Sequence, residues 1–352
     1  MGQIDFLGIV DDDALETLFL PFVSHALPWP VDADVLFLRA RAGVPLFGYS
    51  RAKLLCEQSF RPHADALMRA GLTVGTPADA HYRLVLVLPP RQRSEARAVL
   101  ARALRHAGSG GTVVASLGNT EGARSGESDL QRLAGSVQSL SKNKCRVFWS
   151  EGDASNRDDA LIDEWAELDR PQPISDGRYL SRPGLFAWDR IDPASGLLAH
   201  CLPADLAGQG ADLGCGFGFL ADQVLSRCPG VRGMDLYEAE ARALDLARVN
   251  LAPREESVAL EYFWHDVTQG LPRRYDFVVM NPPFHQSRAD QPDLGRAFIK
   301  AAAAALRPGG RLLLVANRHL PYESTVNEGF EDLRKLADAH GFKVLSGIRK
   351  TP

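Results

Sequence analysis

The chain has 352 residues, of which 45% are hydrophobic and 24% are charged, a balance that is typical of folded globular proteins and excludes a largely disordered chain. This length predicts roughly two domains. No run of 18 uncharged apolar residues occurs and the N-terminus is acidic, so we expect a cytoplasmic protein with no membrane segment and no secretory signal. The five cysteines form no CxxC pair, which predicts reduced thiols and no metal site.

The net charge of −4 conceals a strong segregation along the chain. Residues 38–148 hold 17 Lys and Arg against seven Asp and Glu, whereas residues 1–37 hold seven acids and no Lys or Arg. A block with a net charge of +10 can attract a polyanion such as RNA. Part of it forms a run near helical spacing that predicts either a nucleic-acid contact or a solvated helix face. This run consists of Arg91, Arg93, Arg97, Arg102 and Arg105.

The first half of the chain alternates helical and apolar segments. The expected elements are, in chain order, a helix at 14–22, a buried strand at 35–40, a helix at 64–69, a strand at 82–90, a helix at 94–106 and a strand at 112–118. This alternation predicts an α/β fold with a parallel sheet. The acidic stretch 151–169 then predicts a linker, so we expect domains at 1–170 and 171–352.

The second half repeats the plan of the first. Tyr82–Pro90 reads YRLVLVLPP and Tyr275–Pro283 reads YDFVVMNPP, and each is followed by a helix, a glycine pair and an apolar strand. Two such parallels in the same order indicate a duplicated α/β unit. The first copy has Leu88 where the second has Asn281, and its first strand leads into no glycine-rich loop. We therefore expect a degenerate N-terminal copy and a catalytic C-terminal copy.

A glycine-rich loop in the second half predicts a donor-binding site. The segment ADLGCGFGFL contains Gly214 and Gly216, which permit a tight strand-to-helix turn and close approach of a ligand. Asp212 before the glycines would repel a phosphate but suits a cationic amino-acid group, such as that of S-adenosylmethionine. Asp235 ends the next strand, where a ribose-binding acid belongs, and Asp266 ends the third, near an adenine amino group. Each aspartate alone is also typical of a helix N-cap or a surface residue, but the ordered series of three acids favours a donor site.

The sequence Asn-Pro-Pro-Phe-His at the end of the fourth strand predicts a pocket for a planar amine. The Asn281 side-chain oxygen and the Pro282 carbonyl could accept both hydrogens of such an amine, and Pro283 helps to hold the backbone extended. Phe284 would stack on the ring that bears the amine, and His285 would orient the base or serve a structural role. Positioning and electrostatics suffice for this chemistry.

Two further segments contain candidate residues. Arg318 and His319 follow an apolar strand and would contact RNA or simply lie at the surface. Phe186, Trp188 and Asp189 precede the first strand of the second half and would cover the cofactor or pack.

Four segments resemble the bacterial ribosomal RNA small subunit methyltransferase C family, which methylates guanine N2 in 16S rRNA. They are DLGCGFG, NPPFH, VANRHLPYE at 315–323 and PGLFAWDRIDPASGLL at 183–198. The resemblance implies two tandem Rossmann-like class I methyltransferase domains, the first degenerate and suited to RNA docking. It also implies S-adenosyl-L-methionine as donor, 16S rRNA or the 30S particle as partner, and a monomer.

The resemblance also implies the site residues. The expected donor site comprises Asp212, Gly214, Cys215, Gly216, Asp235, Leu236, Asp266, Val267 and Asn281, and the expected target pocket comprises Asn281, Pro282, Pro283 and Phe284.

Other functions stay open at this point. A sister group that methylates a 23S rRNA guanine has nearly the same motif. Protein-glutamine methyltransferases use a similar motif, usually with Tyr in place of Phe284, and DNA adenine methyltransferases share the amine chemistry. A non-enzymatic RNA-binding protein would require both halves to have decayed. A nicotinamide dehydrogenase is disfavoured by Asp212 and the glycine spacing.

Overall fold

The computed structural model describes residues 12–150, 154–283, 285–286, 289–290 and 292–351. It divides the chain into two compact units, residues 1–170 (unit 1) and 171–352 (unit 2). Within the described ranges, no helix has the length and apolar character needed to cross a membrane.

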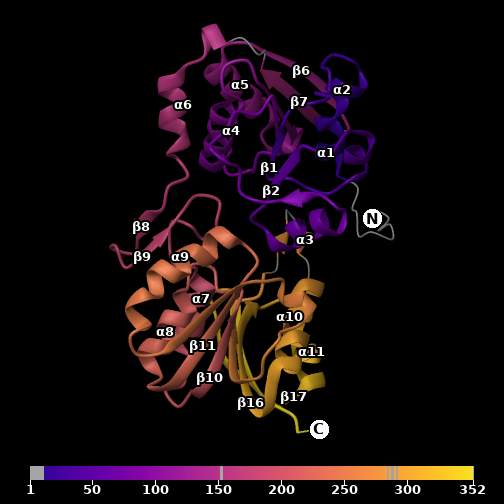
Figure 1. The fold of residues 1–352 in the computed structure, drawn as a ribbon. Coiled ribbons are helices and arrows are strands. Elements are labelled where there is room, and N and C mark those ends of the chain that lie inside the picture. The colour runs from indigo at the N-terminus through magenta and orange to yellow at the C-terminus, as the bar shows by residue number, and fades with distance from the viewer. Residues whose placement is uncertain (1–11, 151–153, 284, 287–288, 291, 352) are drawn as a thin grey trace. The chain divides into compact units, whose positions relative to one another are not determined.

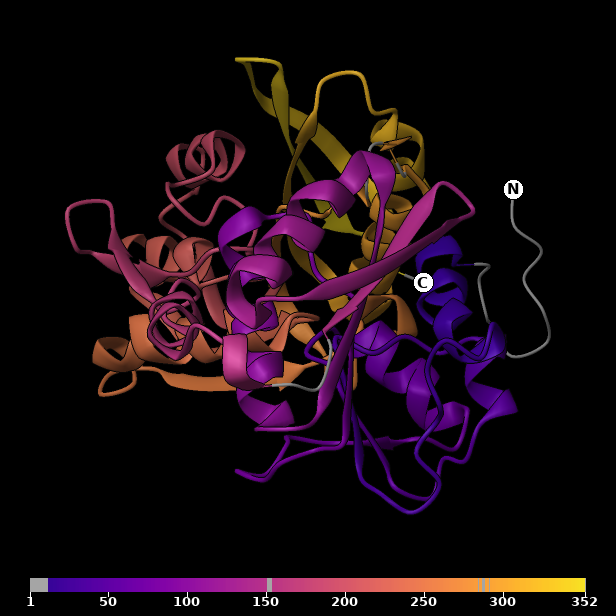
Figure 2. The same ribbon diagram turned by 90° about the horizontal axis from the view of Figure 1, so that it is seen from above.

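Unit 1 is an α/β sandwich around a mixed sheet (Figures 1 and 2). Its elements are α1 (Asp13–Leu18), α2 (Leu20–Val23), β1 (Val35–Leu38), η1 (Val44–Gly48), β2 (Leu54–Glu57), α3 (Arg61–Arg69), β3 (Thr73–Val74), β4 (Leu84–Val87), α4 (Arg93–Ala107), β5 (Thr112–Gly118), η2 (Asn119–Glu121), α5 (Ala123–Ala134), β6 (Val137–Lys142), β7 (Cys145–Ser150), η3 (Ala154–Asn156) and α6 (Asp159–Ala166). The strand order is β3-β2-β1-β4-β5-β7-β6, in which β7 runs antiparallel to both of its neighbours.

Unit 2 has the same architecture after a small antiparallel pair of strands. Its elements are β8 (Gln172–Ile174), β9 (Tyr179–Ser181), α7 (Pro193–His200), β10 (Ala207–Leu213), α8 (Phe219–Arg227), β11 (Gly230–Glu238), α9 (Ala241–Leu251), η4 (Ala252–Arg254), β12 (Ala259–Trp264), η5 (Val267–Gln269), β13 (Tyr275–Met280), β14 (His285–Gln286), β15 (Ala289–Asp290), α10 (Pro292–Ala305), β16 (Leu306–Asn317), α11 (Tyr322–Gly329), β17 (Phe330–Ala339) and β18 (Phe342–Arg349).

The two sheets have equivalent topology, which confirms the duplicated α/β fold. The order in unit 2 is β12-β11-β10-β13-β16-β18-β17, so each strand has a counterpart at the same place in unit 1. The strand repeat detected in the sequence corresponds to β4 and β13, which are the middle strands of the two sheets and pair with β1 and β10. In both sheets the carboxyl ends of the parallel strands meet at one edge, where ligands of open α/β sheets bind.

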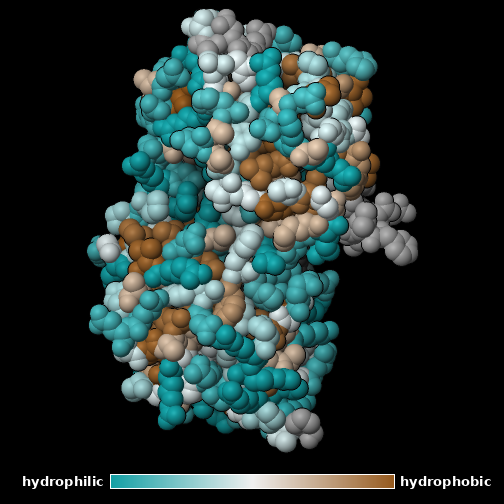
Figure 3. All heavy atoms as spheres, viewed as in Figure 1, coloured by the Kyte–Doolittle hydropathy of each residue, from teal (hydrophilic) through white to brown (hydrophobic). Residues whose placement is uncertain are grey.

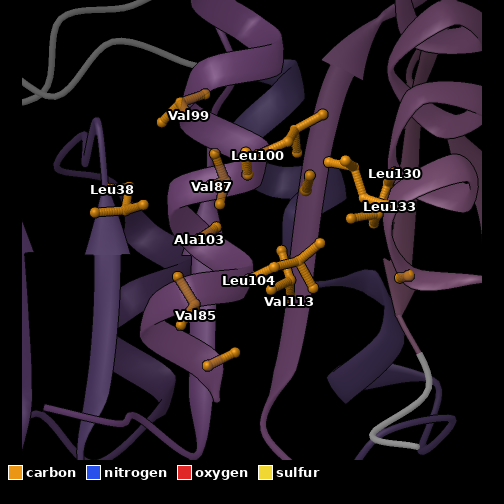
Figure 4. Close-up of a cluster of buried hydrophobic side chains, with 14 of the residues drawn as sticks. Leu38, Val85, Val87, Val99, Leu100, Ala103, Leu104, Val113, Leu130 and Leu133 are labelled. Atoms are coloured by element: carbon orange, nitrogen blue, oxygen red, sulfur yellow. The ribbon is translucent and has the colours of Figure 1, made fainter. Parts of the chain in front are cut away.

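Alternating side chains of the strands bury both faces of each sheet. In unit 1, Leu36 and Leu38 face a core formed with α4 and α5, whereas Val35 and Phe37 face the core on the opposite side. Figure 4 shows α4 laid across the strands of the first face, with Leu100 and other leucines pointing into the core. This two-sided burial explains why the strands read as continuous apolar runs.

The predicted linker at 151–169 is wrong, because much of it forms α6. Asp158 caps this helix by accepting a hydrogen bond from the Leu161 amide at 2.9 Å. Ile162 and Trp165 are 1% and 3% exposed in the core of unit 1. The many acids of this segment occupy the outer side of an amphipathic helix, which composition alone did not distinguish from a linker.

The arginines around α4 make ion pairs within unit 1. Arg91 pairs with Glu121, Arg102 with Glu57 and Arg105 with Asp163, while Arg93 and Arg97 share Asp129. The Arg97 guanidinium also lies 4.3 Å from the ring centre of Trp165. These five arginines are therefore all ion-paired within unit 1, and their contact with RNA stays a prediction.

Candidate active site

The glycine-rich loop joins β10 to α8 and leaves its backbone open. The Gly214 amide donates to the Tyr237 carbonyl at 2.8 Å, which fixes the loop to the adjacent strand. Gly216 has φ +55°, and no heavy atom lies within 4 Å of a β-carbon built at this position. A ligand can therefore approach the backbone closely at Gly216, and a side chain there would be both strained and in its way.

The acid beside this loop is Glu238, not Asp235. Strand β11 runs through residue 238, and the Glu238 carboxylate accepts hydrogen bonds from the amides of Gly216 at 2.8 Å and Glu240 at 2.9 Å. Burial raises the pKa of Glu238, and these two amides oppose the rise. Glu238 thus occupies the position at the strand end where a ribose-binding carboxylate belongs.

Asp235 and Leu236 lie inside β11, and their role in donor binding stays a prediction. Asp235 is 5% exposed and accepts hydrogen bonds from the Tyr275 hydroxyl at 2.7 Å and the Arg273 guanidinium at 3.2 Å. Leu236 is fully buried in the core. The strand extends three residues beyond the predicted end, so Glu238 and not Asp235 stands at its carboxyl end.

Asp212 lies at the end of β10 and is completely buried. Neither carboxylate oxygen has a hydrogen-bond partner among the described residues. The pKa of Asp212 is raised to about 8, chiefly by burial and in smaller part by the nearby Glu238 carboxylate, while the Ala221 amide opposes the rise. A buried acid without a partner is costly for the fold, which is typical of a functional position.

Asp266 follows β12 and caps η5. Its Oδ1 accepts hydrogen bonds from the Thr268 amide at 2.9 Å and the Thr268 hydroxyl at 2.7 Å. Val267 is 2% exposed and packs into the core against α10. The carboxylate therefore lies at the expected edge of the sheet, while the Val267 side chain points away from it.

Asn281 follows β13, and its side chain is hydrogen-bonded to two residues from another part of unit 2. Leu213 and Met280 are in register, so the glycine loop and Asn281 emerge side by side. The Asn281 amide nitrogen donates to Asp192 Oδ2 and Ser195 Oγ, each at 2.9 Å. Asp192 and Ser195 are not among the predicted site residues, although an Asp-Pro-x-Ser segment is a recognisable helix N-terminus.

The rest of the predicted target pocket is described in part. Pro282 is buried and Pro283 is exposed. Phe284 lies outside the described residues, and His285 is described only through its backbone, which pairs with that of Asp290 in the β14–β15 hairpin.

A pocket joins the glycine loop to Asn281. It contains about 450 Å³ of empty space, part of it open to solvent, and its walls include Gly214, Cys215, Asn281, Ser195 and Phe186. Phe186 is 66% exposed. The geometry thus brings a donor-type loop and an amide oxygen into one pocket, which suits transfer of a group to a hydrogen-bonded acceptor.

Trp188 and Asp189, the other two candidates in this segment, do not line the pocket. Trp188 packs against a hydrophobic cluster, and Asp189 pairs with Arg190.

The segment after β16 is fixed by a buried lysine. Lys343 is 4% exposed and donates to the Leu320 carbonyl at 2.6 Å and to the Glu323 carboxylate at 2.7 Å. Arg318 pairs with Asp338 at 2.5 Å. The contacts of Lys343 hold the segment after β16 in a defined conformation at the carboxyl edge of the sheet.

Unit 1 has arginines where unit 2 has the loop glycines. Arg39 and Arg41 follow β1 at the positions that Gly214 and Gly216 hold after β10. Arg39 pairs with the buried Glu95, and Arg41 pairs with Asp12, both at 2.6 Å. Two charged side chains therefore occupy the turn, which agrees with a degenerate first copy.

Comparisons with known proteins agree with this geometry. A family model described as the methyltransferase small domain matches residues 176–346. The chain is 30% identical over 255 residues to ribosomal RNA small subunit methyltransferase C of Salmonella newport, which covers 72% of each protein. It is 27% identical over 293 residues to the protein of the same name from Shewanella pealeana, which covers 82% of this chain and 84% of that protein.

A solved structure is similar over nearly the whole chain. It is a T. thermophilus 16S rRNA N2 G1207 methyltransferase in complex with AdoMet and guanosine. The TM-score is 0.78 at 24% identity, and the match covers 96% of this chain and 92% of that one. This likeness extends to both units and is a similarity of fold.

Proposed function

Since the chain belongs to the ribosomal RNA small subunit methyltransferase C family, we propose that it transfers a methyl group from S-adenosyl-L-methionine to the N2 amino group of a guanine in 16S rRNA. The observation that carries this proposal is the position of Asn281 beside the glycine loop, in one pocket. A donor loop next to an amide oxygen fits alkylation of an amine.

The residues of unit 2 fit a bound S-adenosyl-L-methionine. Gly214 and Gly216 would lie against its amino-acid part, and Glu238 would accept hydrogen bonds from its ribose hydroxyls. Asp266 would lie near the adenine. Asp212 ends the strand before the loop, and its carboxylate would favour the cationic end of this donor when it is ionised. When bound, the donor supplies an electrophilic methyl group.

The target guanine would leave its stack and enter the pocket. The Asn281 side-chain oxygen and the Pro282 carbonyl would accept the two amino hydrogens, which directs the nitrogen lone pair toward the methyl group. The nitrogen–carbon bond forms as the sulfur–carbon bond breaks, and the excess proton leaves to solvent. Phe284 would stack on the base.

Unit 1 would dock the RNA. Because the arginines around α4 are engaged in ion pairs, we assign phosphate contacts to exposed cations that pair with no acid among the described residues. These cations include Arg69, Arg124, Lys142 and Lys144. Phosphate contacts of this kind position an RNA without reading its sequence.

Asn281→Ala tests the proposal. Removing the acceptor oxygen should lower kcat at least about 100-fold, while the donor Kd stays within about twofold because the glycine loop is unchanged. Methyl transfer to 16S rRNA and calorimetric titration of the donor measure the two quantities. Loss of donor binding in this variant, or retained transfer, would contradict the assigned role.

A further inference from the structure

We infer that Asp192 and Ser195 are positioning residues that hold the Asn281 amide in one orientation, so that it presents only its carbonyl oxygen to the substrate. The inference rests on the proposed function for its substrate, an amine. It assigns a role to the N-cap residue of α7 and to a residue in the first turn of this helix, a role that the reaction chemistry alone does not require. The pocket lined by all three residues is where this orientation matters.

The hydrogen bonds determine the orientation of the amide. The Asn281 nitrogen carries two hydrogens, and it has two acceptors at 2.9 Å, Asp192 Oδ2 and Ser195 Oγ. An ionised carboxylate can only accept hydrogen bonds, so the nitrogen must face Asp192. A rotation of the amide by half a turn would bring its oxygen against the carboxylate, which is repulsive. The orientation of the amide therefore follows from the chemistry of its two partners.

The two partners are themselves fixed by the start of α7. Asp192 caps this helix through the Ser195 amide, which donates to Oδ2 at 2.8 Å, and Pro193 occupies the first helical position. Ser195 is 9% exposed, and Leu198, one turn further along, is fully buried in the core. The carboxylate oxygen thus receives two hydrogen bonds at once, one that fixes the helix and one that fixes Asn281.

This arrangement has a consequence for specificity. An asparagine that is free to rotate accepts or donates, and so tolerates either an amino group or a carbonyl at the same place on a base. With both N–H groups engaged, Asn281 can only accept. A base with a carbonyl in place of the amine would set two oxygens against each other, which excludes it from the pocket.

The inference is tested by exchanging the amide of Asn281 and the carboxylate of Asp192 between the two positions. Asn281→Asp puts a second carboxylate opposite Asp192, so we expect kcat to fall about 100-fold near neutral pH. Because two adjacent carboxyl groups share a proton at low pH, the activity that remains should rise as the pH falls. Adding Asp192→Asn restores a hydrogen-bond donor opposite the new carboxylate and keeps a good helix cap. The kcat of the double variant should therefore be about tenfold higher than that of Asn281→Asp and should lack this pH dependence.

A matched control separates positioning from helix capping. Asp158 caps α6 in the same way as Asp192 caps α7. As a single substitution, Asp158→Asn should leave the rate of methyl transfer unchanged. Combined with Asn281→Asp, it should restore none of the lost activity. The donor Kd, measured for every variant, reports that unit 2 is folded.

The outcomes distinguish the inference from the proposed function. Two outcomes would overturn the positioning role and leave the proposed function standing. In one, the wild type transfers methyl groups but Asp192→Asn restores no activity to Asn281→Asp. In the other, Asp158→Asn restores as much activity as Asp192→Asn does. If the wild type transfers no methyl group to RNA, the proposed function fails. The side-chain N–H signals of Asn281 then still test the orientation, because Asp192→Ala should abolish their slow hydrogen exchange, and unchanged exchange would overturn it.

Discussion

Replacement of the buried Asp212 by asparagine should make the protein more stable and less able to bind its donor. Asp212 is fully buried, its oxygens have no partner among the described residues, and burial raises its pKa from an ordinary value of 3.8 to about 8. A group whose pKa is raised by folding contributes stability at low pH that is lost as the pH rises toward the folded value. Wild-type stability should therefore decline from about pH 4 to about pH 8.

The size of the effect follows from linkage. One pKa unit corresponds to about 1.4 kcal/mol, so between about pH 6 and pH 8 ionisation of Asp212 should cost the wild type about 2 kcal/mol of unfolding free energy. Asp212→Asn has nearly the same shape and does not titrate. The difference in unfolding free energy between the two proteins should therefore grow by about 2 kcal/mol over this interval, in favour of the variant.

Urea unfolding of both proteins at a series of pH values measures this difference, because all other titrating groups are common to the pair. Donor titration supplies the second readout. A cationic donor favours the ionised carboxylate, so wild-type affinity should rise with pH across the same interval and that of Asp212→Asn should not. A stability difference that is constant from about pH 6 to pH 8 would refute the reasoning.

Two further predictions concern the donor and the RNA. Glu238→Gln should raise the donor Kd at least about tenfold, because glutamine has one acceptor oxygen where the carboxylate has two, so the Gly216 amide, the Glu240 amide and the ribose hydroxyls lose an acceptor between them. Calorimetry measures this Kd, and an unchanged value would show that Glu238 does not bind the ribose. Arg124→Glu and Lys144→Glu should each reduce, by about one, the magnitude of the slope of log K for RNA binding against log salt concentration. Arg102→Glu should instead chiefly destabilise unit 1, because it breaks the ion pair with Glu57. An unchanged salt slope in the first two variants would exclude them from the docking surface.

Much of the fold could be predicted from local patterns. The duplicated strand motif predicted the two sheets because strands buried on both faces have apolar sequences that repeat visibly. The glycine loop and Asn281 could be predicted because both lie directly after a strand, where the fold places ligand sites. The structure brings them together in one pocket.

The parts that could not be predicted depend on where elements end or on distant contacts. Asp235 and Glu238 are both acids on one strand, and only the true end of β11 distinguishes them. The partners of Asn281 lie 86 and 89 residues earlier in the chain, and no local pattern connects them to it. Their hydrogen bonds exist only because α7 packs beside the sheet.

Methyl transfer to defined RNAs tests the central claim most directly. Tritiated S-adenosyl-L-methionine would be incubated with the full chain and either naked 16S rRNA, 30S particles or 23S rRNA, with DNA as a further acceptor, and the labelled nucleosides would then be separated. We predict label in N2-methylguanosine from 16S rRNA or 30S particles. Label in 23S rRNA alone, in adenine or in protein, or no transfer while the donor still binds, would contradict it.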